Sequence, residues 1–381
     1  MRVLILGPVH KGGSLPPYLD ALATGLEHHG VTVGRAGSAQ IPYDQARQEF
    51  WPAGRVASAA RALARETDPG AWDLVSLNAG NLEYDQLVPA IWAQDGRVVP
   101  PLVHHVHTLA PTLFRDHVPD PRQHRAVRDA IRDAGGHVWF GQYARRQMAG
   151  RAAGVPGGVA WLPATIPAGT IPAARPALAE ALDTALPVIS LYGYAAPYKD
   201  AGLLLAALGS MRVPARGVLA GDFWDDPGQA GIDLTAFTRG PARAGLGELA
   251  VVPGYLGPAD RAALVRASAA GVFPYRPHPS FQGSGAIADY LARAVPVIAT
   301  DVANMAELTA DTGIIVPPGD PQALAAALDA IAIASGSETA ASLARHAAAR
   351  AGRFTAEAHA ARCLTVYQQA AGRSMRRTAT A

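Results

Sequence analysis

The chain has 381 residues, of which 49% are hydrophobic and 17% are charged, and its formal net charge is +2. This length suits two domains of roughly 180 residues each, and the composition excludes an intrinsically disordered protein. The small net charge excludes the strongly basic footprint of a nucleic-acid-binding protein.

The single cysteine, Cys363, excludes an intrachain disulfide and a cysteine-based zinc site. The apolar N-terminus MRVLILGPV is too short for a signal peptide, and no segment approaches the ~18 to 20 apolar residues of a membrane span. We therefore expect a cytoplasmic protein without a transmembrane segment. The excess of Ala, and of Arg over Lys, is typical of a GC-rich genome such as an actinobacterial one.

The first half of the chain alternates buried strands with amphipathic helices, which predicts a Rossmann-like unit with a parallel sheet. Val3–Leu6 is expected to form a strand, and Leu15–His29 a helix. Further strands are expected at Leu74–Leu77, Leu102–Val106 and His137–Phe140. The loop between the first strand and helix lacks the GxGxxG fingerprint of dinucleotide-binding proteins, but Gly12 and Gly13 would let a ligand approach the backbone.

Three histidines occur in the run LVHHVHTLAP, at the end of one of these strands. Alternation along an extended segment places His105 and His107 on one face and His104 on the other. A metal site is disfavoured because no Cys, Asp or Glu nearby completes a set of ligands. A His that contacts substrate and a His with a structural role both remain open.

A Pro- and Ala-rich passage, Ala164–Pro187, predicts a linker, after which the alternation of strands and helices restarts. The second half is expected to contain strands at Val188–Leu191, Gly217–Ala220, Ala250–Val252 and Gly271–Phe273, and helices at Leu203–Leu208, Asp260–Ala269 and Ala323–Ile333. A last helix is expected at Ala356–Gln369, and the basic tail from Arg373 is expected to be disordered.

The stretch GSGAIADYLARAVPVIATD, Gly283–Asp301, predicts a Gly-rich turn, a helix over Ala286–Ala294 and a strand. A helix that begins at such a turn directs unpaired N–H groups at an anion, phosphate above all. Asp289 lies one turn inside this helix, where its carboxylate would accept hydrogen bonds from ribose or sugar hydroxyls. Lys199 in the loop GYAAPYKD and Arg276 follow other strands of the same predicted sheet and supply two cations for a diphosphate.

The succession GYAAPYKD, VVPGYLGPADRAALVRASAAGVFPYR and SGAIADYLARAVPVIATD resembles the second domain of the retaining glycosyltransferases of family 4. The Gly-Gly loop and the His-bearing strand end resemble the first domain of that family. The resemblance implies the GT-B fold, an α/β architecture of two Rossmann-like domains that face a central cleft, with a C-terminal helix crossing back to the first domain. The domains are expected at 1–182 on the acceptor side and 183–355 on the donor side, followed by the helix 356–372 and the disordered tail 373–381.

Two positions depart from the family pattern. Ala196 stands where the loop of the family has Arg, although Lys199 keeps the diphosphate-binding position. Counting back from the PVIA strand places Asp289 on the second Glu of the Glu-seven-Glu motif, which holds the ribose, and Phe281 on the first, which contacts the donor sugar. This chain therefore resembles the Ser-Gly-Ala variant of the motif.

The resemblance implies a metal-independent hexosyl or glycosyltransferase that moves a sugar, with retention, from a nucleoside diphosphate to a hydroxyl acceptor, in natural-product or polysaccharide biosynthesis. The acceptor would be a small molecule or a glycan, and no cofactor is required. His107 and Lys199 are the expected catalytic residues. The expected donor-binding residues are Gly12, Gly13, Gly193, Lys199, Tyr255, Leu256, Gly283, Ser284, Gly285, Ala286 and Asp289. The alternatives are an inactive or weakly active GT-B protein that binds nucleotide sugars, and a nucleotide-sugar epimerase or hydrolase on the same scaffold.

Overall fold

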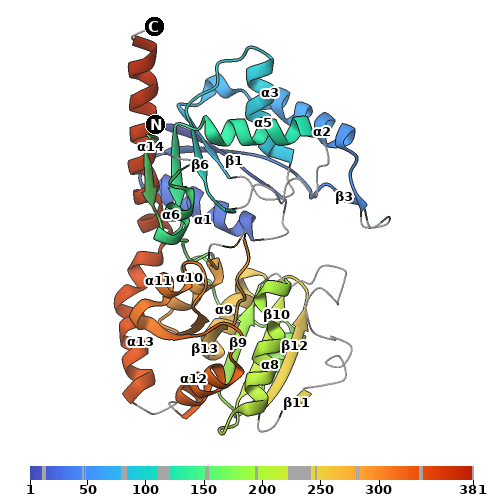
Figure 1. The fold of residues 1–381 in the computed structure, drawn as a ribbon, viewed down its shortest axis with the longest axis vertical. Helices are drawn as coiled ribbons and strands as arrows, with labels where there is room; N and C mark the ends of the chain where they lie inside the picture. The colour runs from blue at the N-terminus through green and yellow to red at the C-terminus, as the bar shows by residue number, and fades with distance from the viewer. Residues whose placement is uncertain are drawn as a thin grey trace. The chain divides into compact units, whose positions relative to one another are not determined.

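The computed structural model describes residues 1–10, 14–44, 47, 49–78, 84–109, 121–150, 154–193, 196–221, 242–244, 247–279, 281, 283–333 and 338–379. The chain divides into two compact units (Figure 1). The first unit comprises Met1–Trp161, Pro279–Gln282 and Ala356–Ala381, and the second comprises Leu162–His278 and Gly283–Thr355.

The first unit is built on a six-stranded parallel sheet. In spatial order its strands are β2 (Thr32–Ala36), β1 (Arg2–Leu6), β5 (Leu74–Leu77), β6 (Leu102–His105), β7 (Gly136–Trp139) and β8 (Gly157–Val159). Its longer helices are α1 (Leu15–His28), α2 (Ala53–Glu66), α3 (Val88–Gln94), α5 (Pro121–Arg132), α6 (Gln142–Met148) and α14 (Ala356–Ala379). A short hairpin, β3 (Tyr43–Asp44) and β4 (Glu49–Phe50), lies outside the sheet.

Helices cover both faces of the first sheet (Figure 1). Helix α14 packs along α1 and against β6, β7 and β8, whereas α3 packs on both α2 and α5. Val3, Ile5 and Leu6 of β1 are fully buried, as a parallel sheet covered on both faces requires. The four strands and the first helix expected here are therefore confirmed, with ends within one residue of those predicted.

The second unit is built on a seven-stranded sheet that is parallel except for one edge strand. In spatial order its strands are β11 (Ala242–Ala244), β12 (Gly247–Pro253), β10 (Arg216–Gly221), β9 (Val188–Tyr192), β13 (Ser268–Phe273), β14 (Val297–Thr300) and β15 (Gly313–Val316). Its helices are α7 (Pro176–Leu182), α8 (Ala201–Ser210), α9 (Pro258–Ala267), α10 (Gly285–Leu291), α11 (Met305–Thr309), α12 (Pro321–Ile333) and α13 (Glu338–Arg350). α8 and α12 pack together, whereas α7 packs on α9.

Three features differ from the sequence-based expectations. The second unit begins at Leu162 rather than at 183, because the supposed linker is bonded to this unit: Thr165 contacts Asp289, and the backbone N–H of Arg175 donates to Asp260. Helix α10 ends at Leu291, because Ala294 has a φ of +58°. The tail expected to be disordered continues helix α14 to Ala379, since it is rich in helix-favouring Arg and Ala.

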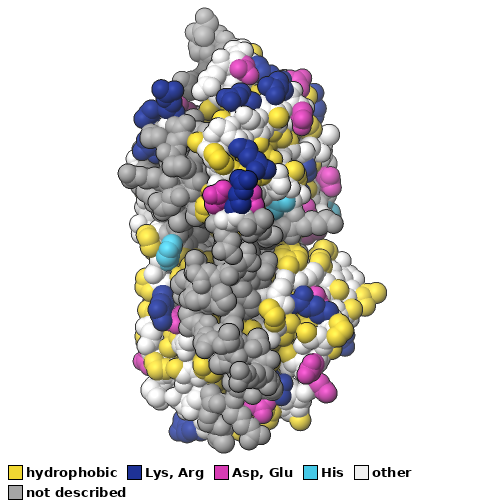
Figure 2. All heavy atoms as spheres, turned by 90° about the vertical axis from the view of Figure 1, so that its right-hand side faces the viewer, with side chains coloured by type: hydrophobic (Ala, Val, Ile, Leu, Met, Phe, Trp, Pro, Cys, Tyr) yellow, Lys and Arg dark blue, Asp and Glu magenta, His cyan; other side chains and the backbone are white. Residues whose placement is uncertain are grey.

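None of the helices in the described part of the chain has both the length and the apolar character that a membrane span requires. On the face shown in Figure 2, basic and acidic side chains are interspersed rather than collected in one patch. This distribution agrees with the small net charge of +2.

Candidate functional site

A backbone ledge lies at the carboxyl ends of strands β9, β10 and β12. It is formed by three glycines, Gly193, Gly221 and Gly254. The N–H of Gly193 donates to Ala220 O at 3.0 Å, and the N–H of Gly254 donates to Gly221 O at 2.7 Å. Gly193 and Gly221 have φ of +122° and +154°, and a Cβ on Gly221 would lie 2.0 Å from Gly193 O. A side chain at position 221 is therefore excluded by the backbone of Gly193, and the three glycines lie at the edge where open parallel sheets bind ligands.

Lys199 ends a short 3₁₀ turn, Pro197–Lys199, beside this ledge. A Cβ on Gly193 would lie 2.8 Å from its Nζ, which is 5.9 Å from the centre of the Tyr275 ring. No carboxylate of a described residue pairs with this ammonium, and burial lowers the pKa of Lys199 to about 8. The group is thus protonated at neutral pH and suited to bind an anion.

The backbone around Lys199 is fixed by the next residue. Asp200 has a φ of +46°, and its Oδ1 caps helix α8 by accepting a hydrogen bond from Leu203 N at 3.1 Å. Arg276 donates to both oxygens of Asp200, from Nε at 2.5 Å and from Nη2 at 2.8 Å. Arg276 was expected to be a second cation for a ligand, but this bidentate pair neutralises it and makes it a support for the loop.

Helix α10 begins next to the same aromatic ring. Ser284 is its N-cap residue, and Ser284 Oγ lies 3.3 Å from Tyr275 Oη. A Cβ on Gly283 would lie 1.9 Å from Asn304 Oδ1, so a larger residue here would displace the Asn304 side chain. The structure thus brings Gly193, Lys199 and the Ser284 turn around Tyr275. Gly285 and Ala286 open the helix.

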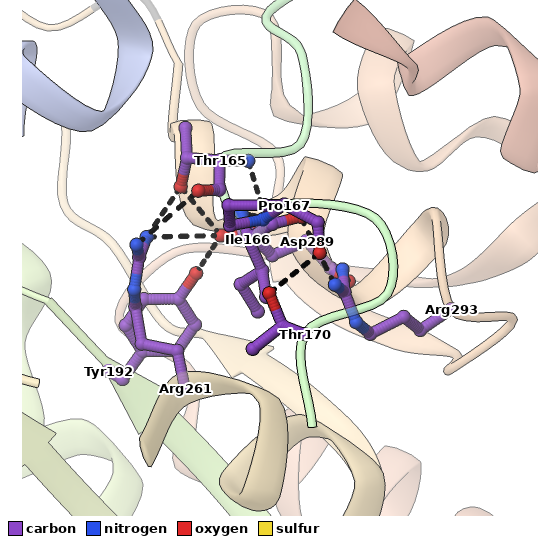
Figure 3. Close-up of polar contacts among 8 residues, drawn as sticks. All are labelled: Thr165, Ile166, Pro167, Thr170, Tyr192, Arg261, Asp289 and Arg293. Carbon is purple, nitrogen blue, oxygen red and sulfur yellow. Dashed lines mark hydrogen bonds and ion pairs between the residues drawn. The ribbon is translucent and has the colours of Figure 1, made fainter. Parts of the chain in front are cut away.

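Asp289, on helix α10, is fully buried and its carboxylate is occupied by protein donors (Figure 3). Oδ1 accepts from the backbone N–H groups of Thr165 at 2.6 Å and Ile166 at 2.9 Å. Oδ2 accepts from Thr165 Oγ1 at 2.9 Å and from the hydroxyl of Tyr192. A carboxylate offers about four acceptor positions. The geometry does not support the expected ribose contact, because all four are used.

Two arginines complete this cluster (Figure 3). Arg261 lies 3.7 Å from Asp289 Oδ2 and donates to Thr165 Oγ1 at 2.6 Å. Arg293 donates to Ile166 O at 3.1 Å. Asp289 therefore anchors the Thr165–Ile166 segment to the second sheet. No local sequence pattern indicated that Thr165 and Tyr192 would contact Asp289, because they lie 124 and 97 residues away in the chain.

Tyr255 and Leu256 lie in the loop after β12, and a single guanidinium holds this loop. Arg175 donates to Pro253 O at 2.7 Å, to Tyr255 O at 3.1 Å and to Gly254 O at 3.2 Å. Tyr255 is 41% exposed, whereas Leu256 is buried. Arg175 is a positioning residue that the sequence did not indicate, since it lies in the supposed linker.

The three histidines of the run LVHHVH, in the first unit, alternate as expected. His105 and His107 both contact the ring of Tyr18, whereas the ring of His104 contacts His137. His105 is fully buried, and its Nδ1 and Nε2 lie 2.7 Å and 2.8 Å from the hydroxyls of Tyr18 and Tyr367. Within this trio, His107 remains partly exposed at the strand end.

Within the described residues, one group of side chains has metal-ligating atoms close together: His105, His359 and Cys363, within 4.8 Å of one another. Local sequence patterns did not indicate this group, because His359 and Cys363 lie on α14, far along the chain from His105. His359 Nε2 also contacts the Tyr18 hydroxyl at 3.0 Å, and its Nδ1 donates to Trp161 O at 2.8 Å. Burial raises the pKa of the Cys363 thiol, and these hydrogen bonds already occupy the imidazoles, so the group fits a structural network better than a metal site.

Gly12 and Gly13, expected to line the donor site, lie outside the described residues. Phe281 is 8% exposed and belongs by contacts to the first unit, while its neighbour Gly283 belongs to the second.

The model of a protein family described as "Glycosyl transferases group 1" matches residues 187–332, which include Gly193, Lys199, Ser284 and Asp289. A search of curated proteins finds no match.

Solved structures extend the likeness to the fold of nearly the whole chain. HepE of Anabaena, in complex with UDP and glucose, has a TM-score of 0.69 at 19% identity, over 97% of this chain and 99% of HepE. Sucrose-phosphate synthase of Thermosynechococcus elongatus has a TM-score of 0.67 at 16% identity, over 97% of this chain and 98% of the synthase chain. The two parallel-sheet α/β units thus have the fold of GT-B glycosyltransferases, as predicted.

Proposed function

We propose that this protein is a glycosyltransferase that moves a sugar from a nucleoside diphosphate to a hydroxyl acceptor, with retention of configuration and without a metal ion. The observation that carries the proposal is Lys199, an ammonium with no carboxylate partner among the described residues, beside the Gly193 backbone ledge and the Ser284 turn. The family match over residues 187–332 and the nucleotide named for HepE support it.

Lys199 would stabilise the departing diphosphate, with the N–H groups at Ser284 and Gly285 as further donors. Charge that develops on a leaving group is best stabilised by donors already in place. The Asp200–Arg276 pair holds the loop of Lys199, so no reorganisation is needed there. His107 would face the sugar or acceptor hydroxyl, and Tyr255 and Leu256 would lie at the nucleoside end.

The proposed reaction is tested by incubating the protein with labelled nucleotide sugars, first without an acceptor and then with pooled glycan and small-molecule acceptors. Slow hydrolysis followed by acceptor-dependent transfer, both unchanged by EDTA, is the expected result. A new sugar nucleotide would identify an epimerase. Absence of any turnover with every sugar would favour a scaffold that only binds nucleotide sugars, and loss with EDTA would refute the metal-free mechanism.

Lys199→Ala is expected to weaken binding of nucleoside diphosphates by about 1.5 to 3 kcal/mol, while nucleoside binding stays the same, because only the diphosphate loses a charged partner. Because the pKa of Lys199 is about 8, diphosphate affinity should also fall as the pH rises above 8 and the ammonium loses its proton. Titration calorimetry between pH 7 and pH 9.5 measures both effects, with the nucleoside as the reference for ionisation of the base.

Arg276→Ala is the matched control, since it removes a nearby cation that is already paired with Asp200. Arg276→Ala should loosen the loop and weaken diphosphate binding. It should keep the dependence of diphosphate affinity on pH, which Lys199→Ala should abolish. Equal losses for nucleoside and diphosphate in Lys199→Ala would show that this lysine does not bind the diphosphate.

A further inference from the structure

Asn78 follows strand β5 and is completely buried, and its amide has one orientation. Its backbone N–H donates to Leu6 O at 2.8 Å. The side-chain Nδ2 donates to both the carbonyl oxygen and the Oγ of Ser76, each at 3.0 Å. A backbone carbonyl can only accept, so the atom facing it must be the nitrogen of the amide. The amide oxygen Oδ1 therefore points the other way.

On that other side Oδ1 lies 3.2 Å from Nε2 of His107. An amide oxygen cannot donate, so Nε2 of His107 must carry a proton. Burial and the neighbouring His359 lower the pKa of His107 to about 3, which keeps the imidazole neutral with a single proton. Nδ1 of His107 is then a bare nitrogen with a lone pair.

From this geometry we infer that Asn78 is a positioning residue that holds His107 as the Nε2–H tautomer, so that the ring presents Nδ1 as a hydrogen-bond acceptor to a substrate hydroxyl. This inference rests on the proposed function for its substrate. It identifies the ligand group at His107 as a hydroxyl donor rather than a phosphate or carboxylate, because the lone pair of Nδ1 would repel an anion.

Aromatic packing and the C-terminal helix hold this arrangement in place. The ring of His107 lies with its centre 4.8 Å from the ring centres of both Tyr18 and Phe140, which restricts its rotation. Ser76, which orients Asn78, accepts a hydrogen bond from the hydroxyl of Tyr367 on α14 at 2.8 Å. The orientation of His107 therefore depends on contacts from four separate segments of the first unit.

The tautomer can be measured directly by ¹⁵N NMR of the full-length protein labelled at histidine. In the wild-type protein His107 should show a protonated Nε2 and a bare Nδ1 near pH 7. Asn78→Leu keeps the volume but removes the acceptor, so the tautomers should mix. Turnover should fall about 10-fold or more while the affinity for the product nucleoside diphosphate stays unchanged.

Asn78→Asp provides a second variant, which replaces the neutral acceptor of His107 Nε2 with a charged one instead of removing it. A carboxylate beside Nε2–H stabilises the imidazolium, so the pKa of His107 should rise and turnover should fall as the pH is lowered below 7, where the ammonium of Lys199 stays protonated. His104→Gln is the control, because His104 lies on the other face of the strand, against His137, and its replacement leaves the contact between Asn78 and His107 intact and should keep the tautomer.

A wild-type His107 protonated at Nδ1, or an unchanged tautomer in folded Asn78→Leu, would overturn the inference. If wild-type protein turns over no nucleotide sugar, the proposed function fails, yet the NMR measurement still decides which nitrogen Asn78 controls.

Discussion

Asp289→Ala is expected to lower the free energy of unfolding of the second unit by about 3 to 5 kcal/mol, because it leaves a buried arginine without its charge partner. Arg261, whose side chain is 8% exposed, would lose the carboxylate 3.7 Å away. The N–H groups of Thr165 and Ile166 would also lose their acceptor. Calorimetry of the two unfolding transitions measures the effect, since one two-state transition cannot be assumed for two units.

The free energy of unfolding of Asp289→Asn should lie between those of the wild type and Asp289→Ala, since an amide keeps the shape and one acceptor oxygen but not the charge. Asp329→Asn is a matched control in the same unit: this buried carboxylate accepts from the N–H groups of Arg212 and Val213, away from the Thr165–Ile166 segment. If Asp289→Asn kept full thermal stability but bound nucleosides more weakly, Asp289 would hold a ribose after all.

Lowering the pH from 7 to 5.5 is expected to destabilise the first unit far more than the second. Among the described residues of the first unit, five histidines have pKa values that are lowered mainly by burial: His104, His105, His107, His137 and His359. For His107 and His359 these values are about 3 and about 4. The described histidines of the second unit, His278 and His346, are partly or fully exposed, whereas His104, His105, His137 and His359 are buried.

The direction of this change in stability follows from proton uptake. An unfolded histidine binds a proton near pH 6.5, whereas His107 and His359 remain neutral until the pH is much lower. Between those values the unfolded state holds more protons, so stability falls as the pH falls. At pH 5.5 His107 and His359 each cost about 1.4 kcal/mol, which together is a large part of the stability of a marginally stable domain.

Tryptophan fluorescence during urea denaturation can follow this effect, because five of the six tryptophans lie in the first unit: Trp51, Trp72, Trp92, Trp139 and Trp161. The fluorescence midpoint should drop between pH 7 and pH 5.5. His359→Gln should reduce the slope of the unfolding free energy against pH by about one proton, or about 1.4 kcal/mol per pH unit. A midpoint that does not change with pH would refute the assignment of these histidines as neutral and buried.

Local sequence patterns determined the order of strands and helices and placed Lys199 at the end of a strand. Apolar runs such as Leu74–Leu77 form buried strands wherever they occur, and a loop after a parallel strand lies at the carboxyl edge of the sheet. Alternation likewise separated His104 from His105 and His107, because the period of two is a local property of extended backbone.

Only the tertiary structure decided which polar groups meet. Asp289 seemed free to bind a ribose, but its partners at Thr165 and Tyr192 lie 124 and 97 residues away. Arg276 was expected to serve a ligand and instead pairs with Asp200, 76 residues away. The order of strands in the sheet, together with the return of the C-terminal helix, brings such groups together. A buried charge must find a partner, and no local pattern specifies which one it finds.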